Sequence, residues 1–285
     1  MLDSMNKDVE KYLRLAKLAV TTKTLYRHYL DVFFSECNPE IDAVGLFDWL
    51  DSHTWSSSTR HSAICAVQGF YAWRFGNLHP VLEAKEKRVN PGPQRTLDKN
   101  KMETIMSQFD AYKPKGIRDL ALFALMTDTG LRASEVCRLE LKYFDMQARR
   151  LFVIIKGGDW GEGVFFDYTA SCMSAWLGIR DRIAKPGTET VFVSTGGKRP
   201  GTSITKDGLR AIFRKYGLSS SIGLISPHDL RRTFATELTL NGAPTRLVQV
   251  AGRWKSISQV EHYTQALSAK DIEPFSPMNR VMEVN

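Results

Sequence analysis

The spacing of apolar residues predicts helices through most of the first 80 residues. Residues 5–18 carry Val9, Leu13 and Leu15 among charged side chains, and a second helix is expected to begin at a Thr22 cap. Apolar residues then recur at helical spacing, at Leu25, Tyr29, Val32 and Phe33. A short helix over residues 42–51 and a longer one opened by the serines at 56–58 complete a predicted bundle of about four helices.

A change in composition separates this bundle from the rest of the chain. Residues 84–97 are rich in charge and contain the run Asn-Pro-Gly-Pro at 90–93, which cannot continue a helix. We therefore expect a helical domain over residues 1–88, a linker over residues 89–97 and a second domain over residues 98–285.

The second domain is predicted to be mixed. Two apolar runs flank a glycine-rich turn in residues 149–168, which is typical of a β-hairpin, and residues 191–194 could add a third short strand. Helices are expected over residues 98–109, 116–127 and 131–139 and again beyond residue 203. The predicted fold class is mainly α with a small β-sheet.

One predicted helix has a first turn suited to an anion. Ser226 can cap it, Pro227 fits its first position, and Leu230, Phe234 and Leu238 form a buried stripe. His228 and Arg231 lie three residues apart, so they share one face near the free N–H groups of the helix N-terminus. Taken alone, the pattern favours the simpler explanation of a surface arginine and an ordinary histidine, because such matches are common.

Other polar and aromatic side chains are candidates for chemistry because of their neighbours. Arg132 follows a Thr-Gly break, and Glu135 stands three residues later, where it can brace the guanidinium. Lys156 ends the first strand of the hairpin, and Trp254 precedes Tyr263 by nine residues. Taken singly, each has a simpler explanation: a surface ion pair, a solubilising lysine, or aromatic packing.

Charge and composition limit the kinds of molecule that the protein is expected to bind. The net charge is +8, and residues 1–90 carry 11 Lys and Arg against 11 Asp and Glu, so the excess falls on the remainder. A basic excess points to a polyanion, most often nucleic acid. There is neither a membrane-length apolar run nor a signal-peptide pattern, and the four cysteines lack zinc spacing. We expect a cytoplasmic protein with reduced thiols.

The order of these residues resembles the tyrosine recombinase family of phage integrases and Xer-type recombinases. The matching stretches lie between about residues 97 and 265: TGLRASE, the hairpin lysine, HDLRRTFAT and GRWKSISQVEHYT. The resemblance implies a helical core-binding domain of SAM-like type, followed by a mixed α/β catalytic domain. It also implies strand cleavage and rejoining through a covalent 3′-phosphotyrosyl intermediate.

The resemblance assigns a role to each matching residue. Tyr263 would be the nucleophile, and Arg132 and Arg231 would hold the non-bridging phosphate oxygens with the help of His228 and Trp254. Lys156 would protonate the leaving 5′-hydroxyl, and Glu135 would brace its surroundings. Cations can do here what metals do in other phosphoryl-transfer sites, and neither an acidic cage nor a P-loop is evident. No metal, ATP or other cofactor is expected.

The sequence departs from the family pattern at several positions. The hairpin turn carries Asp159 and Glu162 where relatives often have basic residues, which puts local DNA contact in doubt. Arg232 and Trp254 stand where many relatives have histidine. A tryptophan keeps an N–H donor but cannot transfer a proton.

The ends of the chain lead to expectations about partners. The chain begins at the core-binding helices, so we expect a simple recombinase that acts on double-stranded DNA at short inverted core sites. It would assemble as a tetramer on two sites, with an accessory directionality factor as a further partner and no contact with a membrane. The tail could dock on its own domain or a neighbouring subunit through Ile272, Phe275, Met278, Val281 and Met282.

Several functions share this chemistry. Integration or excision of a phage or mobile element is the expected role, and Xer-type resolution of chromosome or plasmid dimers is the alternative within the family. A type IB topoisomerase would relax DNA without a second site. A DNA-binding regulator of the same fold would not need Tyr263.

Overall fold

The structure is a computed structural model that describes residues 2–86, 95–155, 157–263 and 267. Within the terminal helices, the side chains of residues 2–4, 262 and 263 are not described. The chain divides into two compact units, Met1–Pro91 and Gly92–Asn285, which we call unit 1 and unit 2. Lys156, most of the predicted linker and the predicted docking residues of the tail lie outside the described residues.

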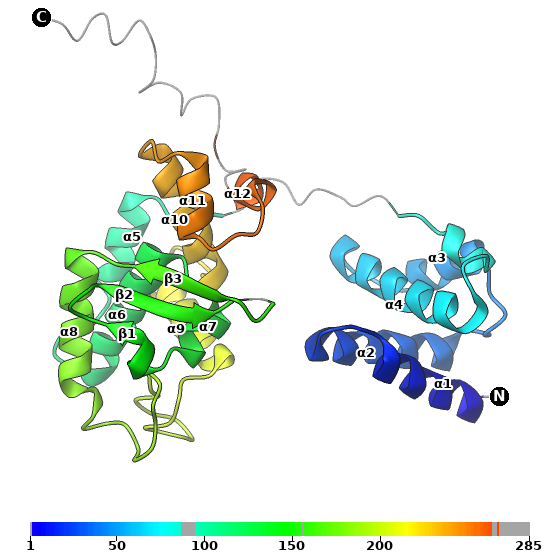
Figure 1. The fold of residues 1–285 in the computed structure, drawn as a ribbon, viewed down its shortest axis with the longest axis horizontal. Helices are drawn as coiled ribbons and strands as arrows, with labels where there is room; N and C mark the ends of the chain where they lie inside the picture. Colours follow the sequence, from blue (N-terminus) through cyan, green and yellow to red (C-terminus); the bar gives the residue numbers. More distant parts are fainter. Residues whose placement is uncertain (1, 87–94, 156, 264–266, 268–285) are drawn as a thin grey trace, which may run out of the picture. The chain divides into compact units, whose positions relative to one another are not determined.

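Unit 1 is a helical bundle (Figure 1). Its helices are α1 (Leu2–Leu15), α2 (Val20–Glu36), α3 (Ala43–Asp51) and α4 (Ser57–Phe75), followed by a 3₁₀ turn, η1 (Pro80–Glu83). The Ser56 side chain accepts a hydrogen bond from the Thr59 N–H and so caps α4 as predicted. The predicted Thr22 cap is wrong, because α2 begins at Val20 with Ala19 before it.

Unit 2 is built mainly of helices (Figure 1). They are α5 (Lys99–Met106), α6 (Pro114–Thr129), α7 (Ala133–Arg138), α8 (Asp167–Arg180), α9 (Lys206–Ser219), α10 (Pro227–Leu240), α11 (Thr245–Ala251) and α12 (Ile257–Tyr263), with a 3₁₀ turn η2 (Leu141–Tyr143). Together with the sheet, these helices confirm the predicted fold class.

The hairpin forms as predicted, but the third strand comes from elsewhere. β2 (Arg150–Ile154) pairs antiparallel with β3 (Trp160–Val164), and β1 (Phe144–Asp145) pairs with the other edge of β2. Residues 191–194 do not join this sheet. Within that run Val193 forms an isolated bridge to Ser203. Val191, Phe192 and Val193 are buried in the main core of unit 2, where Trp176 Nε1 donates to the Val191 carbonyl at 2.9 Å.

Helix α8 was not expected from the sequence. Its apolar residues are interrupted by small and polar ones, which weakens the helical pattern. It is held by tertiary contacts, since Cys172, Met173 and Trp176 are buried in the main core of unit 2. Tertiary packing stabilises such a helix more than its intrinsic propensity does.

Helix α10 runs through the centre of the region that carries the candidate residues. Ser226 caps it, and the Asp229 carboxylate accepts a hydrogen bond from the Ser226 N–H at 2.8 Å, so a reciprocal capping box forms. Leu230 and Phe234 are buried as predicted, whereas Leu238 is partly buried. This helix therefore has a fixed start, and its buried face sets the direction of its polar side chains.

Candidate active site

The turn between α6 and α7 positions Arg132. Gly130 ends α6 with a φ of +60°, a left-handed conformation that glycine adopts without steric cost. Arg132 then donates from Nη1 to Glu135 Oε1 at 2.7 Å, and its N–H donates to Glu135 Oε2 at 2.8 Å. Glu135 is buried, while the Arg132 side chain is 29% exposed. The carboxylate thus holds the Arg132 guanidinium and its backbone N–H from the protein side.

Arg231 is almost fully buried and binds two turns at once. Its Nη1 donates to the Gly130 carbonyl, and its Nη2 donates to the Gly252 carbonyl at 2.6 Å. Its Cζ lies 4.3 Å from the ring centroid of Trp254, a cation–π contact. The predicted i, i+3 partner, His228, lies exposed in the first turn of α10.

Trp254 lies in the middle of this contact network. Its indole is 5% exposed and packs on Phe234 at 6.2 Å between ring centroids, in addition to its contact with Arg231. A Cβ at Gly252 would lie 1.8 Å from the Trp254 ring, so only glycine fits beneath it. The sequence left open whether Trp254 packs in the core or donates to a phosphate. The structure shows that its indole makes packing contacts.

Tyr263 is the last residue of α12, which begins directly after Ser256 as the sequence predicted. Its side chain lies outside the described residues, as does all of Lys156. The structure thus pairs Arg132 with Glu135 and Arg231 with Trp254, and Arg231 also reaches the Gly130 carbonyl two residues before Arg132. His228 lies one turn before Arg231 on α10. The roles of Tyr263 and Lys156 stay predictions.

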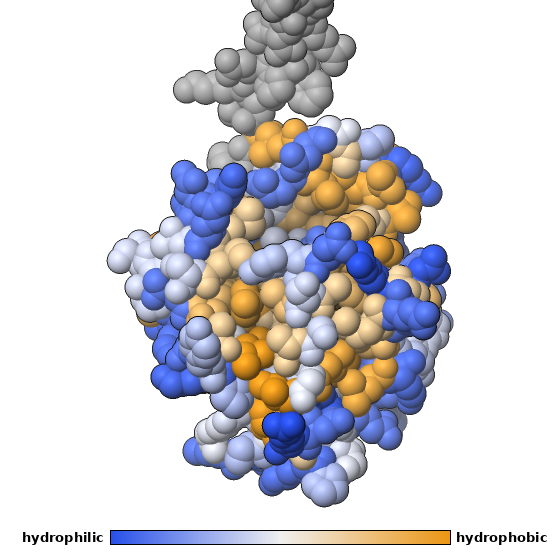
Figure 2. Space-filling model, turned by 90° about the vertical axis from the view of Figure 1, so that its left-hand side faces the viewer, coloured by the Kyte–Doolittle hydropathy of each residue, from blue (hydrophilic) through white to orange (hydrophobic). Residues whose placement is uncertain are grey.

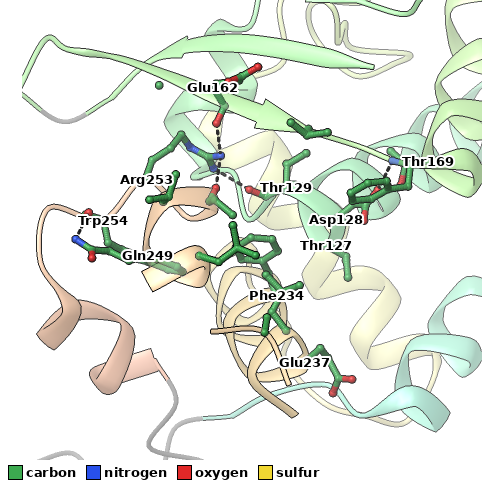
Figure 3. A pocket seen from close by; sticks show the side chains of 18 of the residues that line it. Thr127, Asp128, Thr129, Glu162, Thr169, Phe234, Glu237, Gln249, Arg253 and Trp254 are labelled. Atoms are coloured by element: carbon green, nitrogen blue, oxygen red, sulfur yellow. Dashed lines mark hydrogen bonds between the residues drawn. The ribbon is translucent and has the colours of Figure 1, made fainter. Parts of the chain in front are cut away.

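A fifth residue, Arg253, was missed by the sequence reasoning (Figure 3). Its Nη2 donates to the Thr129 carbonyl at 2.8 Å, and its Nη1 donates to the carbonyls of Ala251 at 2.9 Å and Glu162 at 3.2 Å. Burial lowers its pKa to about 10, with Glu135 opposing this shift and the charge of Arg132 adding to it. The guanidinium therefore remains charged near neutral pH.

The acidic hairpin residues have partners within unit 2. Asp159 lies 3.4 Å from Lys255 Nζ, and Glu162 lies 3.4 Å from Arg150 Nε. Arg232, another expected departure from the family pattern, donates from Nη1 to Asp229 Oδ1 at 3.0 Å. All of these departures from the family pattern thus take part in ion pairs, and those of the hairpin reduce its negative charge.

A large groove of about 1160 Å³ adjoins the site. It is lined mainly by apolar side chains of α6, β3, α10 and α11, including Phe123, Val164, Phe234, Leu247 and Val250. Figure 2 shows that apolar side chains also reach the surface of unit 2, where they gather in patches between polar rims.

Two further findings concern the described part of the chain. Within it, no three His, Cys, Asp or Glu side chains are grouped so that they could hold a metal ion. Among the same residues, no helix combines the length and the apolar character that crossing a bilayer requires.

Comparison with known proteins decides the family. The sequence model of the phage integrase family matches residues 95–270, more than half of the chain. The chain belongs to the phage integrase family. Membership confirms the predicted class of enzyme, a site-specific tyrosine recombinase that cleaves and rejoins DNA strands.

Relatives and solved structures agree with this assignment. Tyrosine recombinase XerC of Roseiflexus sp. (strain RS-1) is 26% identical over 304 residues, covering 99% of this chain and 96% of the relative. XerD of Lacticaseibacillus casei is 33% identical over 171 residues, covering 59% and 57%.

Two structures share the fold. One is XerH site-specific recombinase bound to palindromic difH substrate, with a TM-score of 0.73 at 19% identity over 98% of this chain and 85% of that one. The other is Tn1549 transposon integrase in complex with transposon right end DNA, with a TM-score of 0.74 at 15% identity over 97% of this chain and 98% of that one.

Proposed function

We propose that Tyr263 is the nucleophile of this recombinase and that Arg132, Arg231, His228 and Trp254 surround the phosphate that it attacks. The observation that carries the proposal is the set of contacts made by Arg231. One guanidinium joins the turn before Arg132, the turn before Trp254 and the indole itself. Segments more than 100 residues apart in the sequence therefore meet at one cationic centre.

The proposed step balances as a phosphoryl transfer. The Tyr263 oxygen forms a bond to phosphorus, its proton passes to His228, and the bond from phosphorus to the 5′ oxygen breaks. Lys156 gives its proton to that oxygen, which leaves as a hydroxyl. A free phenol has a pKa near 10 and is a weak nucleophile at neutral pH. Nearby guanidinium groups favour its anion and stabilise the charge that develops on the phosphate oxygens.

The covalent intermediate makes an external energy source unnecessary. The phosphotyrosyl bond retains the energy of the broken phosphodiester, so a 5′-hydroxyl from a second strand can reverse the step. We therefore propose recombination without ATP or metal. The Arg132–Glu135 pair favours this mechanism because it holds a charged, partly exposed guanidinium in one orientation before DNA binds.

We propose that double-stranded DNA is the substrate and that unit 1 contributes to binding it. Its net charge is close to zero, yet cationic side chains gather along a groove between α1 and α2. They are Lys7, Lys11, Arg14, Lys23 and Arg27, with Glu10 paired to Arg27 at 2.7 Å. Lysine and arginine on one surface can neutralise successive phosphates. DNA as substrate would place the protein in the cytoplasm of a bacterial, archaeal or phage-infected cell.

The nucleophile can be tested on nicked DNA duplexes. Because the target sequence is unknown, a library of nicked duplexes with a randomised arm is incubated with the full chain, and covalent adducts are recovered. Cleavage beside the nick releases a short strand, which traps the adduct. We expect adducts with the wild type and none with Tyr263→Phe, while DNA binding persists. An adduct with Tyr263→Phe would identify a different nucleophile.

We propose that the recombinase integrates and excises a phage or mobile element, with dimer resolution as the alternative. The relatives named XerC support the alternative, whereas the likeness to a transposon integrase is compatible with the first role. DNA that flanks the encoding gene should be tested as paired sites on one plasmid and on two. Fusion of two plasmids would support integration, and excision alone would support resolution.

Relaxation of a supercoiled plasmid that carries no site would instead indicate topoisomerase activity. The same reactions repeated with and without host extract would reveal an accessory directionality factor. Both outcomes are read on one gel, since relaxed, excised and fused plasmids differ in mobility.

We also propose assembly of four subunits on two sites, with the tail of one subunit on its neighbour. The apolar groove of unit 2, with a volume of about 1160 Å³ and a mainly apolar lining, suits apolar tail residues such as Phe275 and Met278. Truncation after residue 268 should then weaken assembly on DNA, measured by native electrophoresis. Unchanged assembly would mean that the tail does not join subunits.

A further inference from the structure

We propose that Arg253 is a positioning residue that fixes the segment leading to α12 against the two other segments of the site. This inference rests on the proposed function, because the segment it fixes ends at Tyr263. Arg253 is separated from Trp254 by one peptide bond and precedes α12 by four residues. Its guanidinium lies between β3, the end of α6 and the end of α11 (Figure 3).

Each contact of the guanidinium reaches a segment that carries a proposed catalytic residue. Thr129 lies three residues before Arg132, and Glu162 lies on β3, the hairpin partner of the strand that leads to Lys156. The third contact returns to Ala251 at the end of α11. The planar guanidinium thus holds three parts of the site at fixed distances from one another. A lysine has a single side-chain nitrogen and cannot make the same set of hydrogen bonds.

The same guanidinium reaches the carboxylate that braces Arg132. Arg253 Nη2 lies 3.8 Å from Glu135 Oε2, the oxygen that accepts the Arg132 N–H. Both side chains are almost fully buried, so their charges interact strongly in a medium of low polarity. Glu135 is therefore held from two sides, and loss of Arg253 would leave it held by Arg132 alone.

The surrounding sequence leaves space for this side chain. Gly161 and Gly163 alternate on β3 on the side that Arg253 crosses. A Cβ at position 161 would lie 2.6 Å from Arg253 Cδ, and one at position 163 would lie 3.4 Å from its Nη1. The two glycines of β3 thus leave room for the side chain of an arginine that lies 92 and 90 positions further along the chain.

The backbone of Arg253 is also unusual, with a φ of 55°. A non-glycine residue in this region is strained and persists where its surroundings hold it. Glycine would relieve the strain, so an arginine at this position indicates that its side chain contributes enough to outweigh it. The buried contacts described above are the ones that can do so.

The test compares Arg253→Gly with a matched control. Arg149 also has a positive φ, of 54°, but its side chain is exposed and pairs with Asp167 at 2.5 Å, away from the site. Arg149→Gly therefore makes the same backbone change without removing a contact of the site. The duplex is one selected from the randomised library by the wild type.

Two quantities are measured with the full chain on this duplex: the rate constant of adduct formation at saturating DNA, and the Kd for DNA. We expect Arg253→Gly to lower the rate constant at least tenfold with Kd within about twofold, and Arg149→Gly to change neither. Arg253→Lys retains the charge and the apolar stem, so it should disturb folding less than Arg253→Gly does. Its rate constant of adduct formation should nevertheless also be low. An unchanged rate constant in both Arg253 variants would overturn the proposal.

A double-mutant cycle separates positioning from general destabilisation. If Arg253 acts through Glu135, then Arg253→Gly should slow cleavage much less in a Glu135→Gln background than in the wild type. Equal slowing in both backgrounds would overturn this route. Wild-type chain that forms no adduct, or an adduct that survives Tyr263→Phe, would instead overturn the proposed function, and the inference with it.

Discussion

Replacing Gly130 with alanine tests the geometry of the turn that leads to Arg132 and accepts a hydrogen bond from Arg231. The added Cβ would lie 2.5 Å from Phe234 Cδ1 and 2.9 Å from its Cγ, well inside van der Waals contact. Phe234 is buried on α10 and cannot move without disturbing Trp254, which packs on it. The substitution therefore strains both the turn and the helix that carries Arg231.

The magnitude follows from two terms. A non-glycine residue in the left-handed region costs about 1–2 kcal/mol, and forcing a methyl group into a packed core costs about 1–3 kcal/mol. We expect Gly130→Ala to lower the free energy of unfolding by about 2–5 kcal/mol. For a domain of this size, a loss of about 3 kcal/mol lowers Tm by roughly 6–12 °C.

Gly242 provides a matched control in the same unit. It has a φ of +82°, and nothing lies within 4 Å of the position of its Cβ. Gly242→Ala should thus show the conformational cost alone, about 1–2 kcal/mol. Urea unfolding and thermal melts, both followed by circular dichroism, compare the two variants with the wild type.

A second substitution isolates the steric term. Phe234→Leu makes the side chain smaller where the new methyl would lie, so the double variant should be less destabilised than the sum of the single variants by about 1–3 kcal/mol. Gly130→Ala should also slow adduct formation, because the Gly130 carbonyl accepts from Arg231. If Gly130→Ala is no more destabilising than Gly242→Ala, the Phe234 ring does not occupy the space we describe.

Two further predictions concern polar side chains of unit 2, the buried Tyr216 and the partly buried Cys137. Tyr216→Phe removes a hydrogen bond of 3.0 Å to the buried Asp119 carboxylate and should lower the free energy of unfolding by about 1–3 kcal/mol, whereas Tyr112→Phe, at a residue that is 97% exposed, should have no effect in the same urea titration. Burial raises the pKa of the Cys137 thiol from 9.0 to about 11, so about one thiol in a thousand is ionised at pH 8. Because the thiolate is the reactive form, iodoacetamide should label Cys137 only after unfolding. As the pH rises, the thiol ionises first in the unfolded chain, so the stability that Cys137 contributes is present below pH 9 and lost towards pH 11. Cys137→Ala should therefore lose less stability than the wild type between pH 9 and pH 11. An equal loss of stability in both proteins would contradict the raised pKa.

The sequence predicted much of the site because local rules govern those parts. The Ser226 cap, the Leu230 and Phe234 stripe and the Arg132–Glu135 pair each depend on residues a few positions apart. The hairpin also followed from its own pattern of apolar runs and glycines. In contrast, α8 was missed, because its stability comes from the core against which it packs rather than from its own periodicity.

By itself, the sequence determined which side chains were available for the chemistry and on which helices and turns most of them stand. Only the tertiary structure decided that Arg253 reaches Thr129 and Glu162, that the Trp254 ring lies against Gly252 where a Cβ would clash, and that Asp159 pairs with Lys255. Most of these contacts join residues roughly 90 to 125 positions apart. Arg253 also adopts a left-handed backbone conformation that its sequence context does not predict. Local propensity cannot specify such pairs, because they form only when the packing of the whole unit brings distant segments together.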